Sequence, residues 1–162
     1  MTSARSDRPS REAGSSLARL LLAAGQTEPA RELAEQSDDD VLLGLLALAS
    51  HDFASARRRL DEARAANPFD PRTASARGRL AFLERRFPDA VGDLLEAALL
   101  RPDGLPDATD TRFLKAARAL APGEIPAWPE AAAAAAARLE TAARQLSADV
   151  SWPDRTPGLV RA

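Results

Sequence analysis

The chain has 162 residues, a formal net charge of −2, 45% hydrophobic residues and no cysteine. This length suits one domain with a substantial core, and the near-neutral charge gives no general attraction to nucleic acid or to a membrane surface. The lack of cysteine excludes disulfides, thiol catalysis and cysteine-based metal sites. Lys115 is the one lysine among 22 basic residues, a bias that we interpret as the codon usage of a GC-rich, bacterial-like genome.

The segment 1–14 is polar and charged, and it lacks hydrophobic periodicity. We therefore expect residues 1–14 to form a flexible tail and not a secretory signal. No apolar run approaches the roughly 18 residues of a membrane-spanning helix, so we expect a cytoplasmic protein without membrane insertion.

Helical periodicity, capping residues and breakers predict roughly eight helices along the rest of the chain. Gly25 is expected to end the first helix and Thr27 to cap the second. No strand-like alternation occurs, so the predicted fold class is all-α, with a helical domain over residues 15–147 and a second tail over 148–162. The predicted helices are 15–24, 28–35, 38–50, a fourth that follows Asp52, carries Phe53 to Ala63 and ends before Pro68, then 71–85, 87–100, 111–120 and 129–146.

A tandem repeat fills the middle of the chain. The segment Ser37–Asp70 aligns without a gap with Pro71–Gly104. A repeat with a period of about 34 residues predicts stacked helical hairpins. The matching pairs are Gly44 and Gly78, Ala47 and Ala81, Phe53 and Phe87, Ala56 and Ala90, Leu60 and Leu94, Ala63 and Ala97, and Pro68 and Pro102.

The positions of the small residues, the aromatic residue and the closing proline resemble the tetratricopeptide repeat. The resemblance covers two regular units over residues 37–104 and two degenerate units over 15–36 and 110–147. It implies a right-handed α-solenoid of about four hairpins. The chain departs from the family pattern at Asp40 and Ala74, where the family has a large aromatic residue, and at Arg77, where it has leucine.

The resemblance also implies that the first helices of the hairpins line a concave face that binds a peptide or protein segment. Arg79 and Arg118 would bind its carboxylates, and Phe82 would be an aromatic anchor. An alternative is that Leu22, Leu48 and Phe82 pack against the last helix or the C-terminal tail. The candidate binding residues are Arg19, Leu22, Val41, Leu45, Leu48, Arg72, Ser75, Arg79, Phe82, Leu114 and Arg118.

Three sequence features could suggest a catalytic, metal-binding or phosphate-binding site, but each is better explained by a structural role. His51 is the one histidine and lies in a predicted turn. We interpret the acidic run Asp38–Asp40 as helix capping, because it lacks the spacing of a calcium loop. The run Arg57–Arg59 is followed by Asp61 and Glu62, as on a solvated, ion-paired helix face. We therefore expect no enzyme activity, no cofactor and no metal.

The sequence predicts a non-catalytic adaptor or scaffold that binds a partner segment with acidic and apolar groups, and no nucleic acid. The alternative is a structural accessory subunit of a large assembly, held by its helical body and its two tails. The sequence leaves the oligomeric state open.

Overall fold

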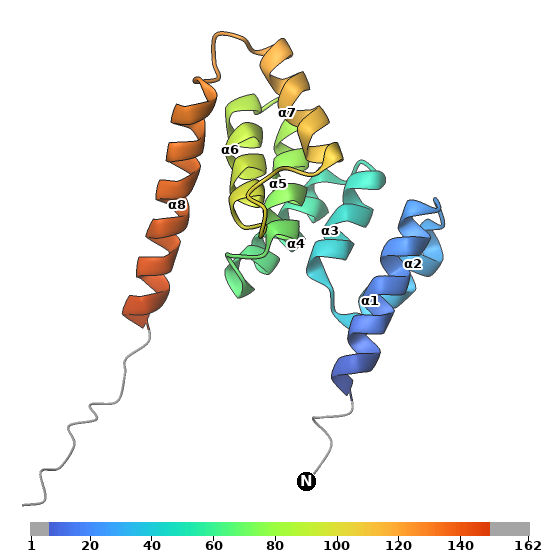
Figure 1. The fold of residues 1–162 in the computed structure, drawn as a ribbon. Coiled ribbons are helices and arrows are strands. Elements are labelled where there is room, and N and C mark those ends of the chain that lie inside the picture. The colour runs from blue at the N-terminus through green and yellow to red at the C-terminus, as the bar shows by residue number, and fades with distance from the viewer. Residues whose placement is uncertain (1–6, 150–162) are drawn as a thin grey trace, which may run out of the picture.

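The computed structural model describes residues 7–149, and this part of the chain forms eight helices and no strand (Figure 1). The all-α prediction is therefore confirmed for the described residues. None of their helices is both long enough and apolar enough to span a membrane. The helices are α1 (Asp7–Ala23), α2 (Thr27–Ser37), α3 (Asp40–Ala49), α4 (Phe53–Ala66), α5 (Pro71–Leu83), α6 (Phe87–Leu99), α7 (Ala108–Leu120) and α8 (Trp128–Asp149).

Two helices, α1 and α7, begin several residues earlier than the sequence predicts. α1 begins at Asp7, inside the segment expected to be a tail, and Pro9 lies in its first turn, where proline is tolerated. α7 begins at Ala108 because the side chain of Asp107 caps it by accepting a hydrogen bond from the Asp110 backbone N–H at 2.8 Å. The expected C-terminal tail lies outside the described residues from position 150 onward.

The acidic run between α2 and α3 has two structural roles. Asp38 ends α2 in the left-handed conformation, with φ of 56°, and so does not begin α3 as predicted. Asp39 caps α3 by accepting a hydrogen bond from the Leu42 backbone N–H at 3.1 Å. Gln26, and not Thr27, precedes α2.

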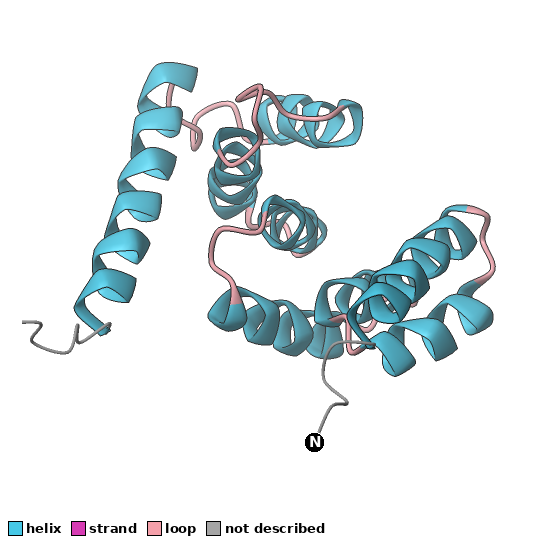
Figure 2. Ribbon diagram, turned by 60° about the horizontal axis from the view of Figure 1, so that its bottom comes forward, coloured by secondary structure: helices cyan, strands magenta, loops and turns pink. Residues whose placement is uncertain are grey.

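The helices pack as successive antiparallel neighbours. Within hairpins, α1 packs on α2, α3 on α4 and α5 on α6, and between hairpins α2 meets α3, α4 meets α5 and α6 meets α7. The first helices of the hairpins also form a row, since α3 contacts both α1 and α5, and α5 contacts α7. In Figure 2 the helices follow one another along an arc, with the α1–α2 pair at one end and α8 at the other.

The two regular units share a close contact between their helices. A Cβ atom on Gly44 would lie 2.7 Å from Leu60, and one on Gly78 would lie 2.6 Å from Leu94. Both leucines are fully buried. Because any larger residue would push the helices apart, these glycines set the spacing of the α3–α4 and α5–α6 hairpins.

The first three hairpins also share one turn geometry. Gly25, His51 and Arg85 have φ values of 77°, 58° and 60°, and each donates its backbone N–H to the carbonyl three residues earlier at 3.0 Å. The following residue donates to the carbonyl five residues earlier in all three turns, which completes a Schellman motif. The sequence predicts the glycine cap, and the structure shows histidine and arginine in the same role.

The last two helices do not form a closed hairpin. α8 packs along α6, and it meets α7 only at its start, where Arg118 of α7 lies over the Trp128 ring. The connection between them contains Ile125, which is buried in a cluster with Leu114 and Ala131. Figure 1 shows α8 standing beside α6 at the end of the molecule. Since α8 makes no helix–helix contact with α1, α3 or α5, it does not cover the part of the predicted binding face that these three helices form.

Candidate functional site

An arginine-lined pocket of about 220 Å³ lies where α1, α3 and α5 meet the connection between α6 and α7. Guanidinium groups from α1, α5 and the connection line it together with apolar side chains of α3. We call it the arginine pocket. Its lining residues are Arg19, Asp39, Val41, Leu42, Leu45, Arg72, Ser75, Ala76, Arg79, Arg101 and Asp107.

The structure brings six of the predicted binding residues together in this pocket. They come from the first helices of three hairpins, which the repeat spacing places side by side. Val41 and Ser75 are buried, whereas Arg19 and Arg72 are exposed. The six residues are Arg19, Val41, Leu45, Arg72, Ser75 and Arg79.

The other five predicted residues lie outside the pocket lining. Leu22 packs against the α1–α2–α3 core, and Leu48 is buried between α3, α4 and α5. Leu114 is also a core residue. The predicted packing of Leu22 and Leu48 against α8 does not occur among the described residues, because α8 contacts neither α1 nor α3.

Phe82 and Arg118 have aromatic partners. The Phe82 ring packs edge to face on Phe87 and Phe113, with centroids 5.4 and 5.0 Å apart. The Arg118 guanidinium lies over the Trp128 ring at 4.8 Å, within cation–π distance. Phe82 therefore belongs to the core, and Arg118 holds the α7–α8 connection.

A buried carboxylate, that of Asp110, binds three of the side chains that line the arginine pocket. The Asp110 side chain has no solvent exposure, and it accepts hydrogen bonds from Ser75 Oγ at 2.7 Å, Arg79 Nη2 at 3.0 Å and Arg101 Nη2 at 2.9 Å. A buried charge is stabilised only when it is paired and hydrogen-bonded. Asp110 therefore fixes both arginines at the pocket wall.

Sequence reasoning missed Asp110, Arg101 and Asp107. The capping pattern before α7 was a usable signal for Asp107. No sequence signal pairs Arg101 with Asp110, because their contact depends on how the inserted loop folds back onto α5.

The remaining arginines of the pocket differ in how firmly they are held. A hydrogen bond to Asp70 raises the pKa of Arg72 and outweighs the opposing effect of burial. Arg72 also lies 3.7 Å from Asp39. The hydrogen bonds that Arg19 makes within the described part of the chain go to its own helix, to Ser15 and Ser16. Arg19 is therefore the arginine best able to turn toward a ligand.

A shallower hollow of about 500 Å³ adjoins the pocket and shares Arg19, Asp39, Val41 and Arg72 with it. It extends along α1 toward Arg11. The two hollows together make an elongated surface along the first-helix row, which suits a segment of chain better than a compact small molecule.

His51 lies in the exposed turn between α3 and α4, with its ring 6.0 Å from that of Phe53. Among residues 7–149, no group of three or more histidine, aspartate or glutamate side chains is arranged to hold a metal ion.

Comparison of the chain with models of protein families, with curated proteins and with solved structures gives no match.

Proposed function

We propose that this protein is a non-catalytic interaction module, an adaptor or scaffold built as a right-handed α-solenoid of the tetratricopeptide-repeat type. It holds an acidic segment of a partner protein in the arginine pocket. The closed hairpins are three and not four, because α8 packs along α6 and meets α7 only at its start.

The repeated geometry supports the solenoid. Gly44 contacts Leu60 in the first regular unit as Gly78 contacts Leu94 in the second. The same turn recurs at His51 and Arg85, which occupy matching positions of the two units. A structure in which equal units contact their neighbours in the same way is the arrangement that a solenoid requires.

One observation carries the proposed binding function, namely the convergence of four arginines on one pocket. Arg19, Arg72, Arg79 and Arg101 line it together with two aspartates. Arginine binds carboxylates with two parallel hydrogen bonds, and the neighbouring Val41 and Leu45 offer apolar contact. A segment with an acidic residue beside an apolar one matches this lining.

The experiment is a selection of random twelve-residue peptides, displayed on phage, against the full chain. The affinity of the best peptide is then measured by fluorescence anisotropy. We expect acidic peptides whose affinity falls about tenfold with Arg19→Glu, since a like charge replaces an attractive one. The affinity should also fall as salt rises.

Arg58→Glu is the matched control, because Arg58 is an exposed arginine on α4 outside the arginine pocket. Peptides without acidic residues, or equal losses in both variants, would contradict the proposal. The accessory-subunit alternative predicts a different outcome, namely that no short peptide binds the pocket and that association with a larger assembly requires the terminal residues.

A further inference from the structure

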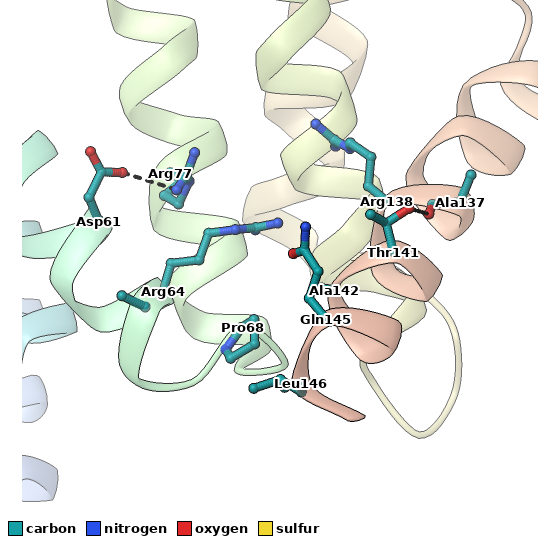
Figure 3. A pocket seen from close by; sticks show the side chains of 11 residues that line it. Asp61, Arg64, Pro68, Arg77, Ala137, Arg138, Thr141, Ala142, Gln145 and Leu146 are labelled. Atoms are coloured by element: carbon teal, nitrogen blue, oxygen red, sulfur yellow. Dashed lines mark hydrogen bonds and ion pairs between the residues drawn. The ribbon is translucent and has the colours of Figure 1, made fainter. Parts of the chain in front are cut away.

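A second and larger hollow lies between α8 and the end of α4, the start of α5 and the connection between them, and it shares no lining residue with the arginine pocket. Its volume of about 700 Å³ is within the range of ligand-binding clefts. We call it the α8 groove (Figure 3). Its lining residues are Asp61, Arg64, Ala65, Pro68, Arg77, Ala137, Arg138, Thr141, Ala142, Gln145 and Leu146.

α8 packs along α6, and Arg138 anchors it there at a position of close approach. A Cβ atom on Gly92 would lie 2.5 Å from Nη2 of Arg138, so this glycine leaves room for the guanidinium against α6. Arg138 Nε then reaches Oε1 of the buried Glu96 at 2.8 Å. Ala131 and Ala135 are buried in the first half of α8, whereas the second half faces the groove.

The accessible side of this groove is positively charged. Arg64, Arg77 and Arg138 come from three helices, and their side chains are 24%, 29% and 43% exposed. Their carboxylate partners Glu96 and Asp93 lie beneath them, with side chains 0% and 10% exposed. A molecule that enters the groove therefore meets three guanidinium groups and one exposed carboxylate, that of Asp61, whose side chain is 56% exposed.

The three arginines retain hydrogen-bonding capacity. Each guanidinium has about five N–H donors. Arg64 uses one for Glu96, and Arg77 uses one for Asp61 at the exposed rim. Acceptors from outside can therefore bind here without displacing the internal pairs.

The rest of the lining restricts the kind of ligand. Pro68 and Leu146 approach each other at one end and make an apolar contact surface (Figure 3). The lining contains no aromatic side chain on which a nucleic-acid base would stack. The combination of guanidinium groups and an aliphatic end fits a polypeptide with acidic and aliphatic side chains.

We infer that the α8 groove is a second docking site, which takes a short acidic segment of a partner protein. Its carboxylates bind Arg64, Arg77 and Arg138, and an aliphatic side chain packs against Pro68 and Leu146. The groove is a site separate from the arginine pocket, so the module can hold two segments at once.

The test selects peptides from the same phage-displayed library against the full chain. The affinity of each selected peptide is then compared between the wild type and variants of α8. Figure 3 shows Gln145 and Arg64 pointing toward one another across the groove, so Gln145→Glu places a carboxylate where the ligand would bind. We expect one class of acidic peptides to lose about tenfold in affinity with Gln145→Glu. The same peptides should keep their affinity with Ala143→Glu, an exposed position of α8 outside the groove, and with Arg19→Glu in the arginine pocket.

Three results would overturn the inference. The first is that no selected peptide distinguishes Gln145→Glu from Ala143→Glu, or that those that do are not acidic. The second is displacement of the selected peptide by a synthetic peptide of residues 150–162, which would make the chain's own end the occupant. The third is self-association of the full chain that Gln145→Glu abolishes in analytical ultracentrifugation, which would make a second copy the occupant.

Discussion

Replacing Gly78 by alanine tests the hairpin spacing on which the fold depends. In an ordinary helix this change stabilises by about 0.5–1 kcal/mol, because glycine loses more backbone freedom on folding. Here the new Cβ would lie 2.6 Å from Leu94 Cγ and 3.1 Å from the Ala90 carbonyl oxygen. Overpacking of this kind costs about 1–3 kcal/mol. We expect a net loss of about 1–2 kcal/mol in the free energy of unfolding.

Gly14→Ala is the matched control, because its Cβ would lie 3.8 Å from Ser37 Cβ, an ordinary contact. It should raise stability by about 0.5–1 kcal/mol. Urea unfolding followed by circular dichroism measures both changes. In a chain that already carries Leu94→Ala only the contact with the Ala90 carbonyl oxygen remains, so Gly78→Ala should no longer destabilise, a coupling of about 1–2 kcal/mol.

Equal gains for Gly78→Ala and Gly14→Ala would refute this reasoning. They would mean that α5 and α6 are farther apart than the structure has them. Loss of stability without coupling to Leu94 would instead assign the cost to some other neighbour.

Three further variants test other parts of the structure. Arg85→Gly should stabilise by about 0.5–1 kcal/mol in thermal unfolding, because glycine adopts the left-handed turn without strain, whereas Arg85→Ala should not. Asp110→Ala should destabilise by about 3–5 kcal/mol in urea, since it leaves Arg79 and Arg101 without their buried partner; a loss below about 1 kcal/mol would contradict that role. Burial raises the pKa of Asp93 despite its arginine neighbours, so the folded state binds its proton more tightly. The unfolding free energy of the wild type, relative to Asp93→Asn, should therefore rise as pH falls from about 8 to about 4, and a fall would show the opposite shift.

The regular hairpins could be predicted because their determinants are local. Gly44, Gly78 and the leucines that face them recur at fixed spacing, and Asp52 and Asp70 cap the following helices as the pattern indicates. The row of first helices follows from that spacing, which is why six predicted residues meet in one pocket.

The other parts of the fold and the site depend on contacts that the repeat pattern does not predict. Asp110 pairs with Arg79 of a distant helix, across an inserted loop. The position of α8 depends on Arg138 lying over Gly92, and neither residue is marked by the repeat pattern. Phe82 was predicted as a binding anchor, and its packing on Phe113 was missed because Phe113 lies in a degenerate unit whose packing the repeat does not determine.

Arg79 and Arg101 line the arginine pocket and also pair with the buried Asp110 of α7. The proposed ligand affinity is therefore coupled to the stability of the junction between α5 and α7. A ligand carboxylate that draws Arg79 or Arg101 toward itself weakens a pair that holds α7 in place. By thermodynamic reciprocity, any change that tightens the α5–α7 junction must lower the affinity for such a ligand by the same factor. On the proposed function, occupancy of the arginine pocket is therefore coupled to the stability of the α5–α7 junction beside it.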